Sequence, residues 1–474
     1  MAKISAFASL SIFNLLLFSS FSALALDIGI GIGIGIGGGS NSPPPSTSPD
    51  CNTPPPPPPP PPPRPPSPPP PLPSKPAPAT SPKHRSPKRS PPRPPTLRFE
   101  SKRIEIAYRV IQNYKSRIEN DPLKVMATWN GTDVCSYKGF RCDKYPDAEN
   151  KRAVSGLSFN NFNFSGSKLT LDGLADKLSD IAYFHANSNF FFGTIPKLIA
   201  MVKFLYELDL SNNKFKGSFP NEVLGAINLT FLDLRFNYYC GPVNPRLFDM
   251  DIIAAIFLNN NKFNQSIPAN VGNTPARYLT FTSNEFTGEI PKSIGTGKTR
   301  KTLIEVLFSD NKLSGCLPME IGQLENTILF DASKNTLTGP IPYSFACLAK
   351  MEVLNFANNR LYGAVPEAVC KLPNLQNFTL YNNFLTQVGP VCRSLIGRKI
   401  LDVSGNCILG LPGQRSEKEC SYFFSKVHSC SDEKSMKYIP CTANKYLYGD
   451  PTAGPLPPPR KMTEMRTYAA LVPN

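Results

Sequence analysis

One asparagine recurs along the chain at a nearly constant spacing, and this repeat restricts the possible fold more than any other feature. It belongs to a pattern exemplified by Leu208-x-Leu210-x-x-Asn213-x-Phe215-x-Gly217. The successive gaps are 24, 24, 24, 23, 27, 24, 24, 24 and 23 residues. The ten asparagines in register are Asn189, Asn213, Asn237, Asn261, Asn284, Asn311, Asn335, Asn359, Asn383 and Asn406. Such a period is typical of a chain built from stacked copies of one small unit.

The pattern predicts what each position of the unit does. Two apolar residues flank one outward residue, which is the period of a short strand. At the asparagine the chain turns, and the side-chain amide can bond backbone groups that the stack would otherwise leave unpaired. No single unit can bury its own apolar edge, so we predict a curved solenoid with a parallel sheet on its concave face. A degenerate eleventh unit precedes the ten at Leu157-x-Phe159, where Phe162 replaces the asparagine.

The repeat resembles the plant-specific leucine-rich repeat, over roughly residues 154–412. Upstream, "AYRVIQNYKSRIENDPLKVMATWNGTDVCSYKGFRC" resembles the N-terminal cap of such proteins, with Ile104, Tyr108, Ile111 and Ile118 on one helix face. The fold class expected is therefore an α/β leucine-rich-repeat solenoid, or horseshoe, with 10–11 repeats and a disulfide cap at the C-terminal end. The predicted segments are a signal peptide (1–25), an Ile/Gly- and Pro-rich tail (26–98), the N-terminal cap (99–153), the repeats (154–412), a Cys-rich C-terminal cap (413–441) and a flexible tail (442–474).

Proline is concentrated in the predicted tail. Of 52 prolines, 29 lie between Pro43 and Pro95, including ten in a row at Pro54–Pro63. Such a block favours an extended, solvated polyproline II helix, because proline fixes φ and has no amide hydrogen. The stretch from Pro43 to Arg98 has eight basic side chains and one acidic side chain, Asp50. It therefore carries +7 of the chain's net charge of +16. This excess indicates a polyanionic partner, with a disordered linker as the alternative.

Ser67-Pro68-Pro69-Pro70-Pro71 resembles the serine-tetraproline unit of plant extensins. Together with the repeats, it makes the chain similar to the leucine-rich repeat extensins, although in their better-known members the extensin region follows the repeats. The tail has no tyrosine before Tyr108 and so lacks the cross-linking residue of extensins. The resemblance therefore implies a wall protein whose basic tail associates ionically with acidic pectin.

Residues 1–25 have the features of a secretory signal: Lys3, an apolar run from Ile12 to Leu17, and Ala23-Leu24-Ala25. The alternative for residues 1–25 is an uncleaved membrane anchor. No later segment has the run of about 18 apolar residues that a membrane-spanning helix needs. We expect a secreted, extracellular protein of the cell wall. Glycosylation sequons occur at Asn130, Asn163, Asn228, Asn264 and Asn377. A glycan on Asn377 would confine ligand binding to the N-terminal and central repeats.

Twelve cysteines in an oxidising compartment should mostly form disulfides. The spacing leaves the pairing open, although the last four cysteines are dense enough to staple a small cap. Cys51 and Cys240 have no obvious partner, and a disulfide-linked homodimer is one possibility. Cys316 and Cys347 lie in separate repeats, and the other disulfide candidates are Cys135, Cys142, Cys370, Cys392, Cys407, Cys420, Cys430 and Cys441.

Outward strand positions form the usual binding surface of a horseshoe. In the first half they combine acids with aromatic residues, a mixture that suits a basic, amphipathic peptide. The predicted contact residues are Tyr183, His185, Glu207, Asp209, Phe231, Asp233, Arg235, Phe257, Tyr278, Glu305 and Asp331. Leucine-rich repeat extensins bind basic secreted peptides, the rapid alkalinisation factors, so the resemblance implies such a ligand. Ordinary solvated sheet residues are the alternative reading.

The sequence contains no nucleophile elbow, metal-ligand cluster or pair of activated carboxylates. We expect no enzyme activity, no cofactor, no metal and no nucleic-acid partner. The competing function is that of an inhibitor or sensor of a wall-degrading enzyme, because polygalacturonase-inhibiting proteins have similar repeats. A purely structural wall protein would need the tyrosines that the tail lacks.

Overall fold

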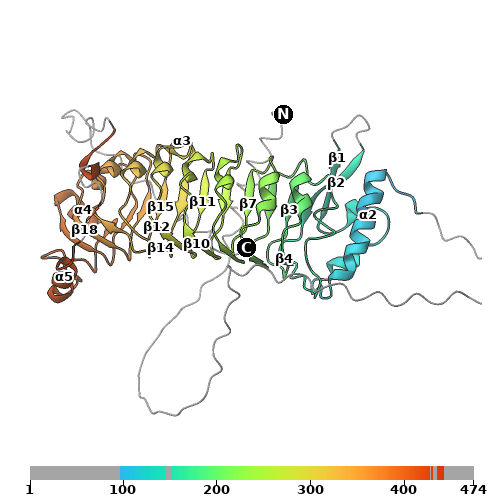
Figure 1. The fold of residues 1–474 in the computed structure, drawn as a ribbon, viewed down its shortest axis with the longest axis horizontal. Helices are drawn as coiled ribbons and strands as arrows, with labels where there is room; N and C mark the ends of the chain where they lie inside the picture. Colours follow the sequence, from blue (N-terminus) through green and yellow to red (C-terminus); the bar gives the residue numbers. More distant parts are fainter. Residues whose placement is uncertain (1–96, 146–150, 428, 431–434, 442–474) are drawn as a thin grey trace, which may run out of the picture.

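The computed structural model describes residues 97–145, 151–427, 429–430 and 435–441. Within these ranges the chain forms one elongated, gently curved solenoid, with helix α2 at one end and helix α5 at the other (Figure 1). The predictions for the signal peptide, for nearly all of the Pro-rich tail and for the segment 442–474 lie outside the described residues.

The N-terminal cap is built on α2 (Lys102–Tyr114), which starts where the Ser101 side chain accepts a hydrogen bond from the Ile104 amide. One face of α2 buries Ile104 and Ile111, as predicted, whereas Tyr108 is only half-buried. Ile118 is buried as well, but it follows the helix and a short 3-10 turn (Lys115–Arg117). The cap closes the first repeat with apolar side chains, as a solenoid end requires.

The concave face is a 12-stranded sheet whose first strand is antiparallel and belongs to the cap. The eleven parallel strands that remain match the predicted repeats, including the degenerate first unit in β2. The strands are β1 (Phe140–Lys144), β2 (Arg152–Ser158), β3 (Tyr183–His185), β5 (Glu207–Asp209), β7 (Phe231–Asp233), β9 (Ala255–Phe257), β11 (Tyr278–Thr280), β13 (Glu305–Leu307), β15 (Leu329–Asp331), β17 (Val353–Asn355), β19 (Asn377–Thr379) and β21 (Leu401–Asp402).

The recurring asparagines are hydrogen-bonded inside the stack, as the sequence predicted. The Asn237 amide donates to the carbonyls of Leu210, Leu234 and Arg235 at 2.9–3.2 Å, and its oxygen accepts from the Phe215 amide at 3.1 Å. The residue before each of the ten asparagines has a positive φ, 54° at Phe236 and 65° at Gly405, so the turn itself lies one position earlier than predicted.

Beyond each asparagine the chain forms a second ladder along the lower edge of the solenoid in Figure 1, here called the second sheet. Its strands are β4 (Phe192–Gly193), β6 (Lys214–Gly217), β8 (Tyr238–Gly241), β10 (Lys262–Ser266), β12 (Glu285–Gly288) and β14 (Lys312–Leu313). The ladder continues as a separate three-stranded sheet of β16 (Thr338–Gly339), β18 (Arg360–Val365) and β20 (Phe384–Val388). Parallel strands of this kind lie about 4.8 Å apart.

The convex side carries short 3-10 helices, mostly after the Ile-Pro or Leu-Pro steps. They are η4 (Lys197–Met201), η5 (Asn221–Gly225), η6 (Pro245–Asp249), η7 (Val271–Asn273), η8 (Lys292–Gly295), η9 (Met319–Gln323), η10 (Tyr343–Cys347) and η11 (Val369–Lys371), with one turn of α-helix in α3 (Thr299–Thr302). Between the convex side and the sheets, one continuous apolar core extends from Ile104 to Ile408. The stacked repeats thus share one core.

The C-terminal end contains α4 (Pro390–Gly397) and α5 (Glu417–Phe424). Disulfides join Cys135 to Cys142, Cys370 to Cys392 and Cys407 to Cys420. All six of these cysteines were predicted disulfide candidates.

The prediction of a C-terminal cap stapled within itself is wrong for two of its cysteines. Cys430 bonds to Cys316 and Cys441 to Cys347, so the terminal segment runs back and is fastened to earlier repeats. Linear spacing holds no information on such a return path. Cys240 is also disulfide-bonded, so it has no free thiol with which to link a second chain, and Cys51 lies outside the described residues.

Candidate ligand-binding face

Strand register brings the predicted contact residues together in two rows along the concave face. In the first row Tyr183 is opposite Glu207 and Glu207 opposite Phe231. In the second row His185 is opposite Asp209 and Asp209 opposite Asp233. Of the eleven predicted residues, ten lie on these strands, and Arg235 follows β7 by two positions.

Most of these side chains are buried, which the sequence analysis did not anticipate. Four are partly exposed: Tyr183, His185, Tyr278 and Glu305. Seven are buried: Glu207, Asp209, Phe231, Asp233, Arg235, Phe257 and Asp331. Neighbours on adjacent strands pack side by side on the inner curve, so most of the outward strand positions in the predicted set are not solvated.

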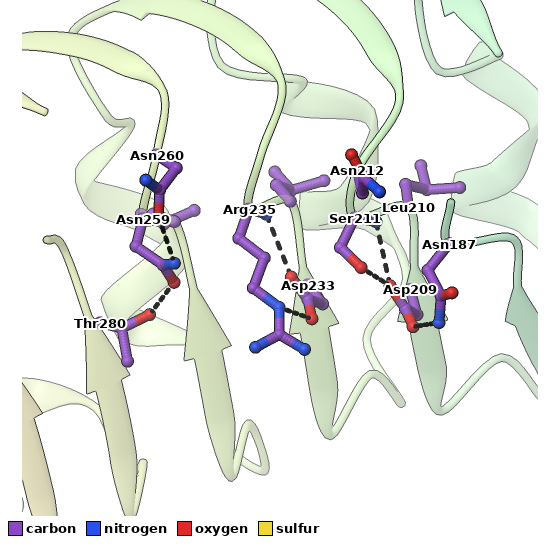
Figure 2. A network of polar contacts seen from close by, with 12 residues as sticks. Asn187, Asp209, Leu210, Ser211, Asn212, Asp233, Arg235, Asn259, Asn260 and Thr280 are labelled. Atoms are coloured by element: carbon purple, nitrogen blue, oxygen red, sulfur yellow. Dashed lines mark hydrogen bonds and ion pairs between the residues drawn. The ribbon is translucent and has the colours of Figure 1, made fainter. Parts of the chain in front are cut away.

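The acids at the strand ends have a structural role. Asp209 Oδ1 accepts hydrogen bonds from the Ser211 amide at 2.9 Å and the Ser211 hydroxyl at 2.7 Å, and its Oδ2 accepts one from Asn187 at 2.9 Å (Figure 2). The same bond to the amide two residues on occurs at Asp233, Asp331, Asn355 and Asp402. These side chains hold the turn after β5, β7, β15, β17 and β21, an Asx-turn function that the recurrence of Asp at one register position could have indicated.

Asp233 and Arg235 form a buried ion pair, with Arg235 Nε 2.8 Å from Asp233 Oδ2 (Figure 2). Burial raises the pKa of Asp233 to about 7; Arg235 opposes this effect and the neighbouring Asp209 adds to it. The Arg235 guanidinium carbon also lies 5.5 Å from the centre of the Phe257 ring. Arg235 therefore reduces the negative charge that the sequence led us to expect at this position.

Glu207 differs from the other buried acids. Its Oε2 lies 2.8 Å from His185 Nε2, whereas its Oε1 is buried and has no hydrogen-bond partner among the described residues. The Tyr183 ring is 5.0 Å from the His185 ring and lies over Gly156, where a Cβ would be only 2.2 Å from the tyrosine ring. Glu207 is thus a carboxylate with unused hydrogen-bonding capacity on an aromatic surface.

Aromatic side chains continue from Glu207 along the face. Phe231 and Phe257 contact each other edge to face, with ring centres 5.4 Å apart, and Tyr278 packs against the cluster that they form with Ala255. Burial raises the pKa of nearby Tyr206 to about 12, and the charge of Glu207 acts in the same direction. This buried apolar cluster is separate from the main core of the solenoid, and Tyr278 is its partly exposed neighbour.

A polar network that the sequence analysis missed lies beyond the aromatic cluster. The Thr280 hydroxyl donates to Asn259 at 2.6 Å, and the Asn259 amide donates to Asn260 at 2.8 Å (Figure 2). Because these groups bond one another, they add rigidity to the face more than they add free binding capacity.

Across the described ranges, no group of three His, Cys, Asp or Glu side chains is placed to hold a metal ion. No described helix has both the length and the apolar composition needed to cross a membrane. Of the sequons, Asn130, Asn163, Asn228 and Asn377 are exposed and Asn264 is half-buried on β10. Asn377 lies on concave strand β19, where a glycan would cover that end of the face.

Comparison with known proteins identifies the repeats. A family model for the leucine-rich repeat matches residues 204–225. Leucine-rich repeat extensin-like protein 7 of Arabidopsis thaliana is 39% identical over 341 residues, covering 72% of this chain and 77% of that protein. Extensin-like protein 2 of the same plant is 42% identical over 338 residues, which cover 71% of this chain but only 42% of that protein.

The chain thus spans less than half of extensin-like proteins 2 and 1. A plant ice-binding protein of known structure has the same fold, with a TM-score of 0.54 and 22% identity over 66% of this chain and 97% of that one. The similarity to extensin-like protein 7 extends over most of both chains, and so the protein belongs to the leucine-rich repeat extensin-like family.

Proposed function

We propose that this protein is a secreted, cell-wall-associated binding module that takes a small basic peptide on its concave face. The observation that carries the proposal is the Glu207 carboxylate, one oxygen of which is buried without a hydrogen-bond partner among the described residues. A buried carboxylate oxygen left unpaired is costly, and a ligand cation that bonds it recovers that cost.

The neighbours of Glu207 favour a cation with an apolar stem. Tyr183 and Phe231 flank it in strand register, and aromatic faces attract ammonium and guanidinium groups. Tyr278, which is partly exposed and packs on the buried Phe231–Phe257 cluster, then offers an apolar ring to the next residue of a bound peptide. Lysine or arginine beside an apolar residue is therefore the ligand chemistry that this part of the face fits best.

The proposed contact residues are those of the predicted set other than Asp209, Asp233 and Asp331, with Glu207 as the anchoring carboxylate. Asp209, Asp233 and Asp331 position the strand turns and contribute to the ligand only through the shape of the face. The basic tail, through its ionic association with acidic pectin, would keep the module in the wall. Peptide binding by the concave face and pectin association by the tail are both functions of a non-catalytic binding protein in growth signalling.

The test is calorimetric titration of the full-length secreted protein with synthetic basic peptides. We expect Glu207→Gln to weaken binding by about 2–3 kcal/mol, since a charge-assisted hydrogen bond is lost while the side-chain shape is kept. The matched control is Glu285→Gln on the second sheet, an exposed acid paired with Lys312, and it should leave the affinity unchanged. Equal affinity of wild type and Glu207→Gln would contradict the proposal.

Capture from wall extracts separates the two candidate functions. Retention of a basic peptide supports the signalling role, whereas retention of a pectin-degrading enzyme, with loss of its activity, would replace that role by inhibition. If neither species is retained at micromolar concentration, the concave face is not a binding site.

A further inference from the structure

Cys240 has a disulfide bond that the five bridges described above do not account for. Those bridges use every other cysteine of the described residues, and none of the described cysteines is free. The chain contains 12 cysteines, and the one that remains is Cys51, in the Pro-rich tail.

We propose that Cys51 bonds to Cys240 of the same chain, and that this disulfide fastens the Pro-rich tail onto the second sheet. The ten prolines that follow, Pro54–Pro63, then lie across the exposed aromatic side chains of that sheet. The tail is thereby an arm attached at two points, and the proposal is independent of ligand binding on the concave face.

The second sheet has an aromatic surface next to Cys240. Tyr238 and Cys240 are two residues apart on β8, so strand alternation places their side chains on the same face. Tyr238 and Phe190 are both 45% exposed. The Lys214 ammonium lies between them, 5.5 Å from the Tyr238 ring centre and 5.7 Å from that of Phe190.

Polyproline fits such a surface because a polyproline II helix is already rigid and packs its rings on aromatic side chains. Pro54 is three positions after Cys51, a reach of about 10 Å, enough to arrive at Tyr238 from Cys240. Ten prolines span about 31 Å, and the four strands from β4 to β10 span only about 15 Å. The run is therefore long enough to cover this patch.

The charges of the two partners also match. Exposed Lys214, Lys216 and Lys262 line this part of the second sheet, and Lys262 is the register partner of Cys240. The only acid of the Pro-rich stretch, Asp50, directly precedes Cys51. No basic residue occurs between Cys51 and Arg64, so the segment that would lie on the lysines carries no like charge.

A tail fastened at Cys240 has a different reach from a free one. Its basic residues, from Arg64 onward, would lie in a loop closed at Cys240 and at the start of the cap near Leu97. A polyanion bound by this loop would be held against the repeats, whereas a free arm of 53 extended residues could reach on the order of 160 Å away.

The disulfide is tested by peptide mapping of the full-length secreted protein under non-reducing conditions, with free thiols alkylated before digestion. We expect a linked pair of peptides containing Cys51 and Cys240, and a monomer on a non-reducing gel. In Cys51→Ser one free thiol per chain should appear, at Cys240, with the other five bridges intact. A Cys51–Cys51 or Cys51–Cys240 dimer, or alkylated Cys51 in the wild type, would overturn the proposal.

The docking of the proline run is tested by photocrosslinking within the same full-length protein. With Tyr238→benzoylphenylalanine, irradiation should join residue 238 to a peptide from the Pro54–Pro63 run. The matched control is Tyr422→benzoylphenylalanine, a more exposed tyrosine on α5, which should give no such product. An equal yield at both positions, or a product at position 238 only between two chains, would show that the run does not dock on the second sheet.

Discussion

At the scale of single residues, Asp233 is an acid in an unusual state. It is fully buried on the concave face, and this burial outweighs the nearby Arg235 and raises its pKa to about 7. The ordinary value for an aspartate is about 3.9. Its ionisation thus falls in a range where most carboxylates are already charged, and it couples the stability of the repeats to pH.

The sign of this coupling follows from proton binding. Between about pH 4 and about pH 7 the folded protein holds a proton on Asp233 that the unfolded chain has lost, so the ion pair with Arg235 forms only above about pH 7. The free energy of unfolding therefore decreases as pH rises through this range. The decrease from this group approaches about 1.4 kcal/mol per pH unit. We expect Asp233→Asn to remove this component, measured as Tm against pH in a series of buffers.

The matched control is Asp402→Asn, which alters an exposed acid with the same bond to the amide two residues on. This control should retain the wild-type dependence of Tm on pH. The interpretation of Asp233 is wrong if the Asp233→Asn variant and the wild type lose stability in parallel between pH 5 and pH 7.

Asp233 also shows which features of the site can be predicted from the sequence and which cannot. The repeat predicts that Asp209 and Asp233 lie on outward strand positions, because the register is dictated by stacking. It does not predict that the Asn187 side chain bonds the second oxygen of Asp209 or that both acids are buried, since exposure and long-range partners depend on how side chains fill the inner curve. For the same reason, the sequence does not predict that one oxygen of Glu207 is buried without a hydrogen-bond partner among the described residues.

At the scale of elements, the disulfides fasten parts of the chain that are far apart in sequence. Cys316–Cys430 closes a loop of 114 residues, and Cys407–Cys420 one of 13. Constraint of the unfolded chain grows with loop length, to about 3 kcal/mol for a loop of ~15 residues and about 4.7 kcal/mol for one of ~100. The long bridge therefore stabilises the C-terminal repeats more than the short one does.

We expect the double variant Cys316→Ser with Cys430→Ser to unfold at a lower guanidinium concentration than Cys407→Ser with Cys420→Ser. Comparing pairs avoids an unpaired thiol in either protein. Each variant should still secrete and keep the remaining bridges, as shown by thiol counting. A larger loss in the Cys407 and Cys420 pair would mean that local cap packing, and not loop closure, governs stability here.

Elements were predictable where a local pattern decides them. The strands, the asparagine turns and helix α2 each follow from periodicity and capping within a few residues. The return of Cys430 and Cys441 to Cys316 and Cys347 does not, because any of many pairings satisfies the same spacing. The cap was therefore predicted in place and in composition but not in connectivity.

At the scale of the whole molecule, two surfaces of opposite character are joined in one chain. The concave face holds a carboxylate and aromatic rings, whereas the Pro-rich stretch from Pro43 to Arg98 contributes +7 to a net charge of +16. In the proposed function, a ligand cation and a wall polyanion are therefore bound by different parts of the protein. The two functions should be separable by mutation and by salt.

Pectin binding tests this separation. A variant in which the eight basic residues from Arg64 to Arg98 are changed to glutamine should lose retention on de-esterified pectin. Wild-type retention should fall as salt rises, because the screening length shortens from about 10 Å at 0.1 M to about 3 Å at 1 M. Column retention of the full-length protein at several salt concentrations measures both effects.

Two controls connect the result to charge. Fully methyl-esterified pectin, which lacks the carboxylates, should not retain the wild type at any salt concentration. Glu207→Gln should bind de-esterified pectin as the wild type does, since it alters only the concave face. Retention that persists at 1 M salt would mean that the tail binds the polysaccharide through its proline surface and not through its charge, and the ionic function of the tail would have to be abandoned.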